Sequence, residues 1–94
     1  MLGEVISTAR SIEQERTTVG VALKVAEETG ELAQAVLKRM GYEEIVSEVA
    51  DVIIAVTDAG YQAALDDGLQ GKYEADLMIA ISNKLNKWCQ VYGK

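Results

Sequence analysis

Val25-Ala26-Glu27-Glu28-Thr29-Gly30-Glu31-Leu32-Ala33 is the most informative segment of this 94-residue chain. Three carboxylates fall within five residues, and the positions around them are mostly apolar and favour a helix. At about 100° per residue, Glu27, Glu28 and Glu31 share one side of such a helix. The segment therefore predicts an amphipathic helix with a concentrated negative charge.

A second acidic pair, Glu48 and Asp51, follows Glu31 after sixteen intervening residues and again lies in an apolar run. Two helices that each present carboxylates three residues apart can form one oxygen-rich cluster when they lie side by side. Such a cluster repels itself unless cations occupy it, and hard divalent cations prefer oxygen ligands. The alternative is that these acids form the solvated face of two helices. Residues 43–65 contain no Lys or Arg to pair with them, however, which favours a metal site.

Composition limits the classes of protein and of chemistry. The chain is 49% hydrophobic and 26% charged, which predicts one globular domain over residues 1–94. A net charge of −6 argues against a nucleic-acid partner. Uninterrupted apolar runs stay well short of 18 residues, so we expect no membrane partner and a cytoplasmic location. Because histidine is absent, acid–base or metal chemistry must use carboxylates, lysines, tyrosines or water.

The periodicity of apolar residues predicts an all-α fold. Apolar residues recur at helical rather than strand spacing, proline is absent, and several glycines fall where helices should end. Thr17 and Thr18 are candidates for capping the second helix at its start, Gly41 is placed to end it, and Gly30 should allow a close helix approach. The segment 66–71 is the clearest loop. The expected helices cover residues 2–16, 19–39, 43–65 and 72–92.

The second and third expected helices carry apolar residues over a broad arc, which usually implies more than one packing partner. Each would be about 30 Å long, and that is more apolar surface than one small bundle can cover. We therefore expect self-association, as a homodimer or a homotetramer.

The two acidic segments together resemble a known family. Glu27-Glu28-x-x-Glu31 followed by Glu48-x-x-Asp51 is similar to the EExxE…ExxD signature of the MazG-like, all-α nucleoside triphosphate pyrophosphohydrolases. The context from Lys24 to Leu32 is similar to the family's K-L-x-E-E-x-G-E-L, and the resemblance covers residues 18–60 well and the last helix loosely. It implies a four-helix MazG-like bundle completed by homo-oligomerisation. It also implies Mg²⁺-dependent cleavage of a (deoxy)nucleoside triphosphate to the monophosphate and pyrophosphate, in the housecleaning of nucleotide pools.

The same resemblance implies roles for particular residues. It places Mg²⁺, for which Mn²⁺ is a possible substitute, on Glu28, Glu31, Glu48 and Asp51. Asp58 lies where the family often carries Asn or Asp near the substrate, although a plain surface acid is the alternative. In the last helix, Lys84, Asn86 and Lys87 resemble the family's phosphate-holding Lys and Asn, but their spacing departs from its K-x-x-x-N pattern.

Three residues have alternatives that the sequence leaves open. Glu27, beside the ligand face, is our candidate for the general base that takes a proton from water, and a metal ligand that shares this task is the alternative. Lys24, one turn before Glu28, could clamp phosphate or simply pair with the acids. Trp88 could stack on a base, but its helical spacing with Leu77, Ile81 and Leu85 favours a core position. For the whole chain, the alternative function is a non-catalytic helical oligomerisation or binding module whose acids are solvated or hold a structural cation.

Overall fold

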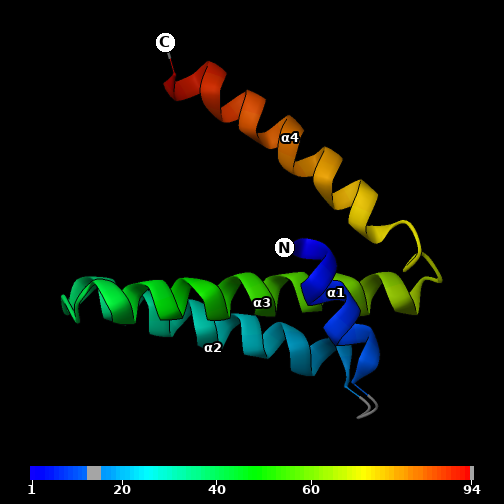
Figure 1. The fold of residues 1–94 in the computed structure, drawn as a ribbon, viewed down its shortest axis with the longest axis horizontal. Coiled ribbons are helices and arrows are strands. Elements are labelled where there is room, and N and C mark those ends of the chain that lie inside the picture. Colours follow the sequence, from blue (N-terminus) through cyan, green and yellow to red (C-terminus); the bar gives the residue numbers. More distant parts are fainter. Residues whose placement is uncertain (13–15, 94) are drawn as a thin grey trace.

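A computed structural model describes residues 1–12 and 16–93, and over these ranges it confirms an all-helical chain with four helices and no strands. The helices are α1 (Leu2–Ser11), α2 (Thr18–Leu37), α3 (Tyr42–Asp66) and α4 (Tyr73–Tyr92). The long helices α2 and α3 form an antiparallel hairpin, α1 crosses α3, and α4 leaves the end of α3 at a wide angle (Figure 1). In this single chain the fourth helix therefore does not complete a compact bundle.

Local hydrogen bonds explain where α2 begins. Thr17 has an extended backbone, and its side-chain oxygen accepts a hydrogen bond from the backbone N–H of Gly20 at 2.9 Å. This is the usual geometry of an N-cap, and it satisfies one of the donors left free at a helix start. The prediction that Thr17 or Thr18 caps this helix is confirmed, with Thr17 as the cap.

The end of α2 differs from the prediction. The helix stops at Leu37, and Arg39, not Gly41, adopts the left-handed backbone, with φ of 52°. The N–H groups of Arg39 and Met40 bond back to Val36 and Ala35, which closes the helix with a Schellman-type turn. Gly41, with φ of 102°, instead precedes α3 as its N-cap residue. The same turn ends α3, where Gly68 takes the left-handed position with φ of 72°.

The first helix is shorter than expected. We predicted a helix as far as Arg16, but α1 ends at Ser11, and Ile12 is extended with φ −73° and ψ 115°. Arg16 lies outside any helix, and its guanidinium donates a hydrogen bond to the backbone carbonyl of Ala9 at 3.2 Å. The part of the predicted helix over residues 13–15 lies outside the described residues.

The core at the crossing of the helices is small. Ile6 and Ala9 of α1 pack against Tyr61 of α3, and Tyr73 at the start of α4 joins them. The Tyr73 hydroxyl donates a hydrogen bond to the backbone carbonyl of Thr57 at 2.8 Å, and the two tyrosine rings lie 6.3 Å apart between centroids. This contact anchors only the first turn of α4.

Beyond that first turn, α4 is open to solvent. Trp88 is 63% exposed, so a core position for this indole is wrong for the single chain. None of the α4 residues that the structure describes is buried. Over residues 1–12 and 16–93, none of the helices combines the length and apolarity needed to cross a membrane.

Candidate metal centre

Packing of α2 against α3 brings acids from both helices together. Glu28, Glu48 and Asp51 each offer a carboxylate oxygen, and these three oxygens all lie within 4.8 Å of one another. Glu28 is only 7% exposed because it faces α3, whereas Asp51 stands at the open side. Residues about twenty positions apart thus form one acidic cluster, as the spacing of the two motifs predicted.

The residues around the cluster supply too few positive charges and hydrogen-bond donors for its carboxylate oxygens. Lys24 Nζ lies 3.0 Å from Glu28 Oε1 and 3.5 Å from Glu27 Oε1. The other oxygens, Glu28 Oε2 and Glu48 Oε2, are buried without a hydrogen-bond partner in the described part of the chain. A buried carboxylate oxygen with no donor is costly, and a hard cation removes that cost. The residues therefore fit a divalent cation.

Electrostatics lead to the same interpretation. Burial raises the pKa of Glu48, and the neighbouring carboxylates of Glu44, Glu31 and Asp51 raise it further. The charge of Glu28 raises the pKa of Glu31, with burial and Glu27 adding to the effect. Neighbouring carboxylates with raised pKa values repel one another when they are ionised. A bound cation removes this repulsion and favours the ionised forms.

The other residues that the sequence predicted for the site lie outside this cluster of three carboxylates. Glu31 is one helical turn beyond Glu28 and is exposed; it does not belong to the converging trio, although its charge acts on Glu48. Glu27 is also exposed and pairs with Lys24. Lys84, Asn86 and Lys87 are all on α4, which in the described chain makes no contact with α2.

A pocket of about 660 Å³ opens between α1, α2 and α3 and adjoins the cluster. Glu28 and Asp51 belong to its lining, and so does Asp58, two helical turns beyond Asp51. Most of the remaining wall is apolar or small. It includes Val5, Ala9, Ile12, Val21, Ile54 and Ala55.

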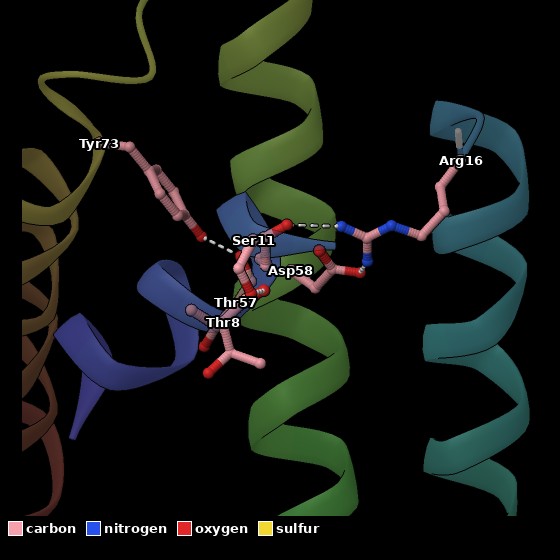
Figure 2. Close-up of polar contacts among 7 residues, drawn as sticks. Thr8, Ser11, Arg16, Thr57, Asp58 and Tyr73 are labelled. Atoms are coloured by element: carbon pink, nitrogen blue, oxygen red, sulfur yellow. Dashed lines mark hydrogen bonds and ion pairs between the residues drawn. The ribbon is translucent and has the colours of Figure 1, made fainter. Parts of the chain in front are cut away.

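Asp58 is held by an ion pair that crosses this pocket. Figure 2 shows Arg16 reaching from beside the start of α2 to Asp58 on α3, where Arg16 Nη1 and Asp58 Oδ2 are 2.5 Å apart. Both side chains are largely buried, and Asp58 Oδ1 is buried with no hydrogen-bond partner among residues 1–12 and 16–93. Asp58 is thus a structured wall residue with one free acceptor oxygen, rather than a plain surface acid.

Arg16 and the α1 wall of the pocket were missed from the sequence. The helical pattern placed Arg16 at the end of a longer first helix, and its partner lies 42 residues away. No local signal identifies such a pair, apart from the scarcity of cations near so many acids.

Comparison of the chain with models of protein families, with curated proteins and with solved structures finds no match in any of the three. The geometry of the site and the motif spacing therefore carry the functional argument.

Proposed function

We propose that this protein is a Mg²⁺-dependent pyrophosphohydrolase that cleaves (deoxy)nucleoside triphosphates to the monophosphate and pyrophosphate. One observation carries the proposal: three carboxylates from two helices converge, with unpartnered buried oxygens, at the edge of a pocket of about 660 Å³. This pocket is within the size range of small-molecule sites, and its wall joins apolar surface to a few polar groups.

Glu28, Glu48 and Asp51 would hold the metal, and Glu31 is placed to join them if its side chain turns toward α3. When bound, Mg²⁺ supplies charge neutralisation on phosphate oxygens and lowers the pKa of a coordinated water. Glu27, which is exposed beside the cluster, would accept a proton from the attacking water. Lys24, bonded to Glu28, would orient that carboxylate or bind a phosphate oxygen.

The apolar part of the pocket would take the nucleoside. Its wall from α1 and α3 offers apolar contact, and the unpartnered Asp58 Oδ1 could accept a hydrogen bond from a base or a sugar hydroxyl. Arg16 keeps the other Asp58 oxygen occupied and so fixes the direction of the free one. In this proposal the protein works as a homo-oligomer in the MazG-like manner, and Lys84, Asn86 and Lys87 are candidates for binding phosphates in that assembly.

The experiment is an assay of pyrophosphate and orthophosphate release from a panel of canonical and modified nucleotides, with and without Mg²⁺. We expect pyrophosphate, and we expect Glu48→Gln and Asp51→Asn each to lower kcat/KM on the order of 100-fold or more, since each removes a ligand charge. Glu43→Gln, at an exposed acid in the first turn of the same helix, is the matched control and should retain activity.

Folded protein that binds Mg²⁺, measured as a rise in melting temperature, but releases neither product from any nucleotide would contradict the proposal. That result would leave a binding module with a structural cation. Release of orthophosphate instead of pyrophosphate would contradict the proposed cleavage to the monophosphate, but not the proposed Mg²⁺-dependent hydrolysis of nucleotides.

A further inference from the structure

The pocket between α1, α2 and α3 has two ends of different chemistry. Asp51 and Asp58 both line it, and they lie on the same side of α3, about 10 Å apart along the helix axis. Because α2 runs antiparallel to α3, Glu28 lines the pocket beside Asp51, whereas Thr17 lines it beside Asp58 (Figure 1). We call the first the metal end and the second, where Arg16 bonds to Asp58, the arginine end.

The wall between the two ends is apolar. Val21 on α2 and Ile54 and Ala55 on α3 line the pocket, and each lies between the two ends along its helix. Lys24 also lines the pocket, but it is paired with Glu28 and so belongs to the metal end. An apolar wall between two polar ends suits an organic ring with polar groups at both of its sides, and it would strip water from a bare ion without replacing it.

The arginine end has an unpartnered hydrogen-bond acceptor. Arg16 donates to Asp58 Oδ2, and its other terminal nitrogen donates to the backbone carbonyl of Ala9 at 3.2 Å. Asp58 Oδ1 is buried, and residues 1–12 and 16–93 offer it no donor. An ion-paired carboxylate has only acceptor oxygens, so Oδ1 favours a ligand that brings a donor and disfavours one that brings another acceptor.

We propose that Asp58 Oδ1 selects the base of the nucleotide by accepting a hydrogen bond from an exocyclic amine, so that cytosine and adenine nucleotides are the substrates. This inference rests on the proposed function, in which the metal end holds the phosphates. The sugar then lies next to the phosphates, and the group that reaches Asp58 is on the side of the base farthest from the sugar. That group is an amine in cytosine and adenine, but a carbonyl oxygen in uracil, thymine and guanine.

The discrimination follows from the cost of two acceptors that face each other. A site that bonds one polar group of its substrate rejects an analogue without that group by up to roughly 10⁴–10⁵-fold. The Asp58 side chain is 17% exposed, so water can reach it and lower this cost. We therefore expect a preference on the order of 100-fold, which is typical of a hydrogen bond to a charged group.

Arg16 acts as a positioning residue, because it decides which atom of residue 58 stays free. A guanidinium has only donors, so in Asp58→Asn it must bond to the amide oxygen. The amide NH₂ then takes the place of Oδ1, and the free group changes from an acceptor to a donor with almost no change in shape. We expect this variant to prefer the carbonyl of uracil to the amine of cytosine.

The test measures the dissociation constants of non-hydrolysable α,β-imido analogues of dCTP, dUTP and CTP by calorimetry with Mg²⁺, together with pyrophosphate release from the three nucleotides. The wild type should bind the dCTP analogue on the order of 100-fold more tightly than the dUTP analogue. It should bind the dCTP and CTP analogues alike, and Asp58→Asn should reverse the preference between cytosine and uracil. Asp67→Asn makes the same chemical change at an exposed acid that follows α3, and this matched control should keep the wild-type preference.

A double variant tests the role of Arg16. In Arg16→Ala with Asp58→Asn the amide can turn either its oxygen or its NH₂ toward the base, so the preference should nearly disappear. Circular dichroism establishes that each variant is folded. A folded double variant that still prefers uracil would contradict the positioning role of Arg16.

Equal binding of the dCTP and dUTP analogues by the wild type, or no binding of either, overturns the proposal. An Asp58→Asn variant that keeps the wild-type preference does so too. A preference between dCTP and CTP, with none between dCTP and dUTP, would assign Asp58 to a sugar hydroxyl instead. Pyrophosphate release without any preference for a base would contradict this inference alone, whereas selective binding of analogues without hydrolysis of any nucleotide would contradict the proposed activity alone.

Discussion

The two carboxylate oxygens of Glu28 have different surroundings. Oε1 lies 3.0 Å from the Lys24 ammonium, which is half-exposed, whereas Oε2 is buried and has no donor among the described residues. The hydrogen bond to Glu28 raises the pKa of Lys24, so this lysine stays charged at neutral pH. One exposed cation cannot neutralise three converging acids, and a bound metal would contribute stability here as well as chemistry.

The raised pKa values of Glu48 and Glu31 predict a pH-dependent stability. A carboxyl with a folded pKa above its ordinary 4.5 binds its proton more tightly in the fold than in the unfolded chain. Its contribution is therefore most favourable at low pH and is lost as the pH rises from 4.5 through the folded pKa. Without metal, Glu48→Gln should melt at a higher temperature than wild type at pH 7–8, and the difference should shrink toward pH 4.

Adding Mg²⁺ at pH 7.5 should reverse this order, because the wild type keeps the ligand that the variant lacks. The measurement is the melting temperature by circular dichroism across pH, with and without the metal. Equal melting temperatures for wild type and variant at every pH would contradict a raised pKa of Glu48 in the folded protein.

Gly30 is a residue whose predicted role is wrong. We expected it to allow a close helix approach, but in the described part of the chain a Cβ added there meets nothing within 4 Å. Because glycine in a helix interior costs roughly 0.5–1 kcal/mol relative to alanine, Gly30→Ala should raise the free energy of unfolding by about that amount. Urea denaturation measures it, and Gly68→Ala, at a left-handed position, is the contrasting control that should destabilise.

At the scale of elements, the junction of α3 and α4 depends on one close contact. Gly60→Ala would place a methyl group in the volume of the Tyr73 hydroxyl and ring, whose nearest carbon would be 2.7 Å away. We expect a loss of roughly 1–3 kcal/mol of unfolding free energy, because a helix crossing this tight has no space for overpacking. Tyr73→Phe should cost about 1 kcal/mol through the hydrogen bond to Thr57.

A double-mutant cycle separates the clash from a general loss of helix stability. The effect of Gly60→Ala should be much smaller when Tyr73 is replaced by Ala, because the atoms it meets are then absent. Strictly additive effects would mean that the two residues do not touch in solution. Unfolding by urea, monitored by circular dichroism, provides all four free energies.

On the scale of the whole molecule, the single chain is less compact than its length allows. Its radius of gyration is 15.0 Å. A compact domain of this length should have roughly 12 Å. The excess comes from α4, which joins the core only through its first turn and carries its apolar residues into solvent. A homo-oligomer, as proposed, would offer a further surface to this helix, so the proposed activity is best measured at protein concentrations that favour assembly.

The sequence by itself determined what depends on neighbours within about four residues. Apolar periodicity predicted four helices, Thr17 was predicted to cap α2, and the spacing of the acids placed each set on one helix side. These features follow from backbone hydrogen bonds and side-chain directions that repeat every turn. For the same reason Glu28, Glu48 and Asp51 were recognised before their contact was seen.

Only the tertiary structure decided which of the predicted site residues come into contact with one another. It separated exposed Glu31 from the converging trio, paired Arg16 with Asp58 across 42 residues, and directed Lys84, Asn86 and Lys87 away with α4. Such outcomes depend on how helix faces pack and on how a turn such as that at Gly60 and Tyr73 aims the next helix. Contacts between distant residues are selected by the sum of many weak packing energies, and no single segment of the sequence contains that sum.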